Sequence, residues 1–133
     1  MIPKFRAWDV LAEKMIDEIL IISFVRKEII GKFSDGSTSV PLKFEDERNG
    51  EDVILMQSTD MVDRDGKIIF EGDIVKMAKD VYSEPTYYEV VRHRGGAYRL
   101  DSKQHGCELW LRHTDCEVVG NIYENRELLE DKK

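Results

Sequence analysis

The chain has 133 residues, which suffices for one domain with a hydrophobic core and excludes two large domains. Charged residues make up 35% and apolar residues 41% of the chain, a balance typical of folded rather than disordered proteins. The net charge of −7 opposes binding to nucleic acid or anionic lipid unless the basic residues gather on one face, and it permits a basic protein partner.

The chain also lacks the sequence signals of membrane insertion and secretion. Its longest apolar run, residues 19–22 followed by Phe24 and Val25, is far below the ~20 residues of a bilayer span. Residues 1–9 do not resemble a signal peptide. Two cysteines, Cys107 and Cys116, are too few for a disulfide framework and are expected to be reduced. We therefore expect a cytoplasmic protein without membrane contacts.

Residues 1–52 predict a β-rich and loop-rich N-terminal segment. Alternation over residues 5–9 indicates a strand with aromatic residues on both faces. The run from Met15 to Phe24 fits a buried strand or a helix, and its β-branched content favours strands. Turn-forming residues at 34–39 and the charged stretch 45–52 predict loops.

Residues 53–125 predict a small β module within one domain that spans 1–133. A strand at 53–57 leads to a turn at Asp65-Gly66, where glycine supplies a positive φ. Short strands at hairpin spacing follow, at 74–78, 87–92, 98–100, 109–111 and 117–123. Because a small sheet buries its apolar face by curling, we expect a small SH3-like barrel. Asn125 is expected to cap a short helix within 126–133.

Five strings in the chain occur in an order that resembles one known family. They are Lys4 to Asp9, residues 55–59, residues 63–67, Glu71 to Val75, and Gly120 to Asn125. Together they resemble the YopX family of small phage and prophage proteins over most of residues 4–129. The chain departs from the pattern at 60–62, where Asp-Met-Val replaces Gly-Leu, and at about 21–51, which is longer than the pattern. The resemblance implies a phage or prophage product of a bacterial cytoplasm and supplies no catalytic residues.

Two histidines and two cysteines suggest a metal site or a cysteine nucleophile. His105, Cys107, His113 and Cys116 are residue types that bind zinc, but their spacing matches no zinc motif. If 109–111 is a strand with both leucines inward, Cys107 and His113 share that face. A cysteine nucleophile would also need an orienting group and an oxyanion hole. The simpler interpretation is a buried structural cysteine and surface histidines.

Acidic residues surround the Gly66 and Gly72 turns. Asp63, Asp65, Glu71 and Asp73 could bind a divalent cation or act as acid and base, but they lack the spacing of a calcium loop. Turn formation explains them more simply. Asp73 is expected to accept hydrogen bonds from nearby backbone N–H groups.

Basic and aromatic residues alternate in the 87–110 region. This composition is typical of a groove that binds single-stranded nucleic acid through phosphate contacts and base stacking. The competing interpretation is a solvated basic strand face with aromatic core residues. The candidate contacts are Arg92, Arg94, Arg99, Lys103, Tyr98 and Trp110.

These features favour a non-enzymatic protein that needs no cofactor or metal. We expect it to bind a protein partner or to form a homo-oligomer, because its aromatic strands and large apolar N-terminal part exceed what one small barrel covers. The first alternative is a nucleic-acid-binding small-barrel module. The second is a metal protein or enzyme that uses the cysteines and histidines.

Overall fold

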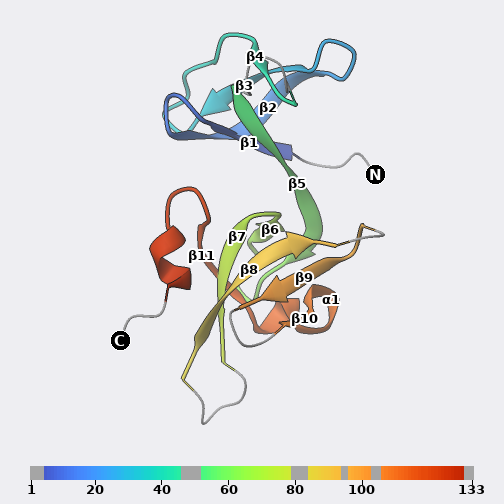
Figure 1. The fold of residues 1–133 in the computed structure, drawn as a ribbon, viewed down its shortest axis with the longest axis vertical. Coiled ribbons are helices and arrows are strands. Elements are labelled where there is room, and N and C mark those ends of the chain that lie inside the picture. The colour runs from blue at the N-terminus through green and yellow to red at the C-terminus, as the bar shows by residue number, and fades with distance from the viewer. Residues whose placement is uncertain (1–4, 46–51, 79–83, 94–95, 103–105, 131–133) are drawn as a thin grey trace. The chain divides into compact units, whose positions relative to one another are not determined.

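The structure is a computed structural model that describes residues 5–45, 52–78, 84–93, 96–102 and 106–130. The described residues are mainly β, with strands β1 to β11 and the short α-helix α1, which Figure 1 labels. The chain divides into two compact units, Met1–Gln57 and Ser58–Lys133. Within the described part, no helix is long and apolar enough to cross a membrane.

The first unit contains five strands of a six-stranded antiparallel sheet with the order β4-β3-β2-β1-β5-β6, whose last strand, β6 (Ile68–Phe70), belongs to the second unit. Its long central hairpin confirms the prediction of strands for the isoleucine-rich run, because β-branched side chains pack well on a pleated surface. Its elements are β1 (Phe5–Asp9), β2 (Lys14–Ser23), β3 (Glu28–Phe33), β4 (Leu42–Lys43) and the first half of β5 (Val53–Val62).

One face of this sheet forms a compact hydrophobic core. Ala7 pairs with Ile16 on β2 and with Leu55 on β5, so residues distant in sequence meet across β1. Phe44 is 1% exposed and packs in this core, although it lies between the two stretches expected to be loops, 34–39 and 45–52. The core consists of Ala7, Ile16, Ile29, Phe44 and Val53.

Strand β5 continues from the first unit into the second. Residues 53–57 pair with β1, and Ser58 and Val62 pair with β6. Asp60 has a φ of 63°, at a shift in the β5–β6 register, which is how a bulge bends a strand. Sequence patterning places a boundary at 52/53, whereas the compact units divide at 57/58, because residues 53–57 complete the first sheet.

The second unit contains a five-stranded antiparallel sheet with the order β10-β9-β8-β7-β11. Three short helical segments accompany it, namely α1 (Leu109–Arg112), η2 (His113–Asp115) and η3 (Arg126–Leu129). Its strands are β6 (Ile68–Phe70), β7 (Asp73–Met77), β8 (Thr86–Arg92), β9 (Tyr98–Asp101), β10 (Gly106–Glu108) and β11 (Glu117–Asn121).

The core of the second unit joins β6 and α1 to the inner face of the sheet. Ile69 of β6 and Leu109 of α1 are both fully buried in it. The other buried members are Val75, Met77, Tyr88, Val90, Leu100 and Cys116. The strand pairings among the described residues do not join β10 to β11, so no closed barrel is found. The predicted SH3-like barrel stays a prediction.

The structure differs from two sequence-based predictions, the strand at 109–111 and the helix cap at Asn125. Residues 109–111 belong to α1 rather than to a strand, so Leu109 is fully buried while Trp110 and Leu111 are 61% and 57% exposed. In a strand, side chains two positions apart point to the same face, whereas in a helix they do not. The change from strand to helix therefore separates the side chains of Leu109 and Leu111. Asn125 precedes η3, as expected, but its side chain makes no capping hydrogen bond.

Candidate functional site

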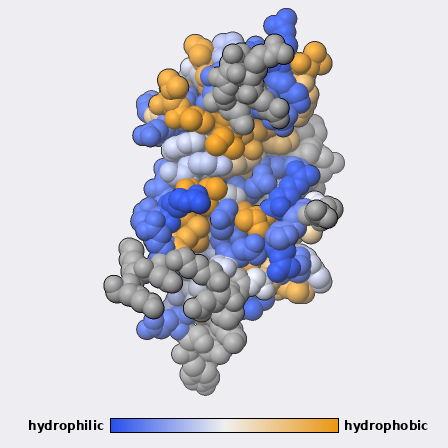
Figure 2. All heavy atoms as spheres, viewed as in Figure 1, coloured by the Kyte–Doolittle hydropathy of each residue, from blue (hydrophilic) through white to orange (hydrophobic). Residues whose placement is uncertain are grey.

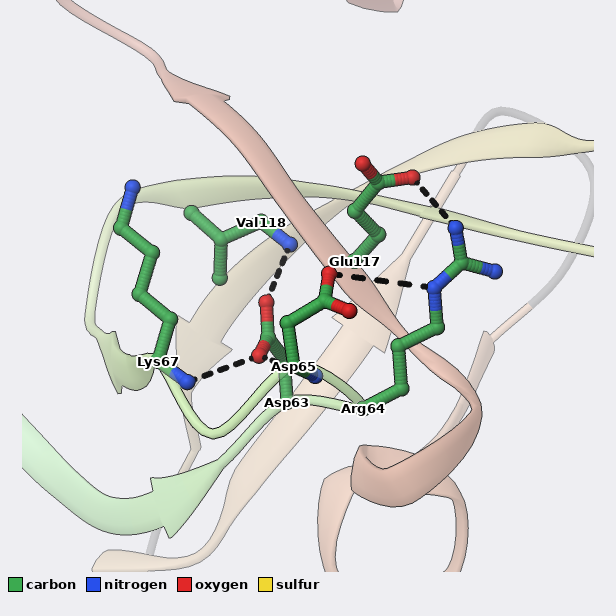
Figure 3. Close-up of polar contacts among 6 residues, drawn as sticks. All are labelled: Asp63, Arg64, Asp65, Lys67, Glu117 and Val118. Atoms are coloured by element: carbon green, nitrogen blue, oxygen red, sulfur yellow. Dashed lines mark hydrogen bonds and ion pairs between the residues drawn. The ribbon is translucent and has the colours of Figure 1, made fainter.

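Asp63 is a buried carboxylate that accepts three backbone hydrogen bonds. One carboxylate oxygen, Oδ1, accepts from the N–H groups of Asp65 and Lys67 at 2.9 Å each. The other, Oδ2, accepts from the N–H of Val118 on β11 at 2.9 Å (Figure 3). The Asp63 side chain therefore closes its own turn and fastens it to β11.

This environment favours the ionised form of Asp63. Burial acts to raise its pKa, and the backbone donors of Val118, Lys67 and Asp65 lower it by more, so the pKa lies below the ordinary value. A carboxylate held by three fixed donors has little freedom to act as an acid or base. Its geometry explains it as a structural residue, in agreement with the turn-forming interpretation.

Arg64 gives the same turn a second attachment to β11. Its N–H donates to the carbonyl of Cys116 at 2.9 Å, and its Nη2 donates to Glu117 Oε1 at 2.7 Å. Figure 3 shows these side chains on one side of the turn, with Arg64 reaching over to Glu117. Asp65, 4.0 Å from Arg64 Nε, is mostly exposed. The acidic residues near Gly66 thus serve the turn.

Asp73 has the role that the sequence predicted for it. Its Oδ2 accepts the Phe70 N–H at 2.8 Å, and the side chain is almost fully buried. Gly72 has a φ of 86°, which side-chain-bearing residues rarely adopt, and its N–H and carbonyl bond to Val90 and Ile122. The Glu71-Gly72-Asp73 turn therefore ties β7 to its neighbours.

The Gly120 to Asn125 string forms a closed polar turn. The Asn125 side chain fills the space where a Cβ on residue 120 would lie, which explains the glycine. Asn125 Oδ1 accepts the Asn121 N–H at 3.2 Å, so this side chain closes the turn instead of capping η3. Asn121 Oδ1 in turn accepts the N–H groups of Tyr123 and Glu124. The string is a folding element.

The structure places the cysteines of the proposed metal or nucleophile cluster in or against the core. Cys116 is fully buried, and burial raises its pKa to about 12. Burial also raises the pKa of Cys107, which packs against the same core. Both thiols are thus protonated near neutral pH, which disfavours a nucleophilic role.

The histidines of that cluster do not join the cysteines in a ligand set among the described residues. His113 Nδ1 lies 2.8 Å from the carbonyl oxygen of Val62. His105 lies outside the described residues. In the part of the chain that the structure describes, no group of three or more histidine, cysteine or acidic residues is arranged to hold a metal ion.

The structure brings two of the candidate nucleic-acid contacts together, because Arg92 of β8 pairs with Tyr98 of β9. Arg99 forms ion pairs with Glu108 at 2.6 Å and with Asp101 at 3.8 Å, so two carboxylates balance its charge. Tyr98 precedes it on β9 and packs against the core. Arg92 is exposed at the end of β8, and Trp110 is exposed on α1. Arg94 and Lys103 lie outside the described residues.

The β2–β3 hairpin carries an apolar surface that sequence reasoning did not locate. Several large apolar residues at this hairpin are exposed, and Figure 2 shows apolar residues in orange at the surface of the first unit. The apolar run was visible in the sequence, but its division between core and solvent depends on bulges in the β2–β3 register. We call the exposed apolar residues of this hairpin, together with Val40 before β4, the hairpin patch: Leu20, Ile21, Phe24, Val25 and Val40, of which Phe24 also packs edge-on against the core residue Phe44.

A hollow of about 350 Å³ lies beside the hairpin patch. Ile21 and Ile30, which pair across β2 and β3, contribute to it, and Arg26 and Glu28 add charges of opposite sign. Its remaining lining residues are Ser23, Ile29 and Pro41. This is the best candidate for a functional surface in the described part of the chain, because the polar networks around Asp63, Asp73 and Asn121 are explained by the turns they close.

Comparison with known proteins places the chain in a family. The fold defines an antiparallel β protein with two compact units. The family model described as YopX protein matches residues 4–130 of this chain. The chain therefore belongs to the YopX family, as its strings suggested. No curated protein matches it.

Two solved structures have a similar fold. Protein EF1440 from Enterococcus faecalis is 28% identical, with a TM-score of 0.65 over 98% of this chain and 99% of the other. Protein YopX from Bacillus subtilis is 24% identical, with a TM-score of 0.63 over 96% and 98% of the two chains. These matches extend over both units of the chain.

Proposed function

We propose that this protein is a non-enzymatic accessory protein of a phage or prophage, active in the bacterial cytoplasm, which works by binding protein. The observation that carries the proposal is the hairpin patch. Val25 is 95% exposed, and Ile21 and Phe24 are each more than half exposed. Each Å² of apolar surface removed from water contributes about 25 cal/mol, so a protein that covers this patch gains binding energy.

We propose a non-enzymatic role because the acidic and cysteine side chains that could be reactive have structural roles among the described residues. Asp63 and Asp73 bond backbone N–H groups, and Cys116 is a core residue. A titratable group in an active site would instead face a cleft and a second reactive group.

For the second unit, we propose an SH3-like barrel as the scaffold. The support is that Ile69 of β6 packs on the inner face of the five-stranded sheet, so two layers already enclose one core. An experimental structure in which backbone hydrogen bonds join the strands into a closed barrel would support the proposed scaffold, and an open sheet would contradict it.

Capture from host cells tests the function. Three tagged forms of the protein are compared: the wild type, Val25→Asp and the control Leu11→Asp. Each is cross-linked in host cells during prophage induction, and the proteins that it retains are identified. Leu11 is 91% exposed in the β1–β2 turn, at the other end of β2 from Val25. We expect the wild type and Leu11→Asp to retain the same proteins, copies of the chain included, and Val25→Asp to lose them.

Retention of the same proteins by Val25→Asp would contradict the proposal. Nucleic-acid binding is the competing function, and exposed Arg92 and Trp110 support it among the described residues. Binding to single-stranded DNA or RNA that weakens steeply with salt, and that Arg92→Ala and Trp110→Ala reduce, would favour that alternative.

A further inference from the structure

The hollow beside the hairpin patch holds two opposite charges in an apolar setting. Arg26 lies in the β2–β3 turn, and Glu28 begins β3, two residues further on. Both residues line the hollow together with Ile21 and Ile30. The surface therefore presents a basic group, an acidic group and an apolar centre within one hairpin.

Arg26 is exposed and has no ion-pair partner among the residues that the structure describes. Its backbone N–H donates to Ser23 Oγ at 3.1 Å, which fixes the turn. Among the described residues, no carboxylate lies within ion-pairing distance of its guanidinium. Neighbouring lysines differ in this respect, because Lys27 pairs with Glu45 at 3.0 Å and Lys43 pairs with Glu28 at 3.4 Å.

Glu28 can accept from a further donor. A carboxylate has two oxygens and about four lone-pair sites, and the Lys43 ammonium group lies near one oxygen at 3.4 Å. The Glu28 side chain is 27% exposed, so its carboxylate is partly shielded from water, which strengthens an ion pair formed there. An arginine fits this position because its planar fork can engage both carboxylate oxygens.

We propose that a second copy of this chain occupies the hairpin patch, with Arg26 of each copy paired to Glu28 of the other. This inference rests on the proposed function and names its partner. In a two-fold interface the same surface meets itself, so a basic and an acidic group on one patch each find a complement. A partner of a single charge sign would be attracted to one of them and repelled by the other, and Lys43 already balances part of the Glu28 charge.

The apolar residues fit the same arrangement. Val25 is nearly fully exposed and Ile21 is 59% exposed, and a two-fold contact would cover both in each copy at once. Apolar centres rimmed by complementary charges are the usual anatomy of protein interfaces.

Charge reversal tests this pairing. Dimerisation is measured by light scattering for Arg26→Glu, for Glu28→Arg, for an equimolar mixture of the two, and for the double variant. Each single variant places like charges opposite each other and should weaken dimerisation about tenfold or more. The mixture and the double variant restore opposite charges at both contacts, so both should recover dimers.

The control Leu11→Asp should dimerise like the wild type, and circular dichroism should show that every variant folds. A wild-type protein that stays monomeric, or a mixture that fails to recover dimers, would overturn the inference. If the wild type stays monomeric while Val25→Asp still loses captured host proteins, the partner is wrong and the proposed function stands. If Val25→Asp also retains those proteins, both are wrong.

Discussion

Asp63 is a residue whose local role has a measurable effect on stability. Asp63→Asn replaces Oδ2 with an amide group that opposes the Val118 N–H, so one buried donor loses its acceptor. We expect a loss of about 1–3 kcal/mol in the free energy of unfolding at neutral pH, measured with urea. The control Asp65→Asn changes an exposed carboxylate and should have little effect.

The contribution of Asp63 should also depend on pH. Its folded pKa lies below the ordinary 3.8, so the stabilisation is complete above that value and is lost as pH falls through the folded pKa. The stability difference between the wild type and Asp63→Asn should therefore shrink in acid. A difference that stays constant down to low pH would contradict this account.

Glu89 is expected to have the opposite dependence. Burial raises its pKa above the ordinary 4.5, Arg126 lowers it, and Asp101, its cross-strand neighbour, raises it. Folding therefore favours the protonated form, and stability declines as pH rises through the folded pKa. Glu89→Gln should raise the thermal unfolding midpoint at neutral pH and have no effect below the ordinary pKa.

A matched substitution separates burial from charge removal in the Glu89 experiment. Glu108→Gln removes a carboxylate that forms an ion pair with Arg99 at 2.6 Å, so it should not stabilise the protein. If Glu89→Gln lowered the midpoint at neutral pH, the burial argument would be wrong.

The α1 element can be distinguished from a strand by two leucines. In the structure Leu109 is fully buried and Leu111 is exposed, whereas a strand would turn both inward. Leu109→Ala should cost about 2–5 kcal/mol of stability, and Leu111→Ala no more than about 0.5 kcal/mol. Chemical denaturation measures both, and similar large losses would indicate the strand instead.

Local pattern predicted the β-rich elements well. The isoleucine content of β2 and the Asp65-Gly66 turn were sufficient to predict a strand and a tight turn. The Leu109-Trp110-Leu111 alternation was misleading because three residues fit a strand or one helical turn equally well. The role of Asn125 was missed because capping and turn closure use the same amide oxygen.

At the scale of the whole molecule, the pairing of strands distant in the chain could not be predicted from the sequence. The pairing of β1 with β5 brings residues 5–9 beside residues 53–57, and no local signal specifies such a partner. Burial of Phe44 follows from that same assembly. The candidate surface was therefore predictable as excess apolar content in the N-terminal part, but its position on the hairpin was not.

The net charge of the molecule opposes association between two copies. With a net charge of −7, two copies repel each other at long range, so a dimer requires local attraction that exceeds this repulsion. The apolar hairpin patch and the two Arg26–Glu28 contacts supply such an attraction. The association should therefore be sensitive to Val25, at the exposed centre of the turn.

Sedimentation equilibrium of the wild type and Val25→Asp over a wide concentration series tests this contact most directly. The wild-type mass should rise with concentration from 15.5 kDa toward twice that value, and the mass of Val25→Asp should stay at that of one chain. A wild-type mass that remains at 15.5 kDa at the highest concentration, or an equal rise for Val25→Asp, would contradict the account.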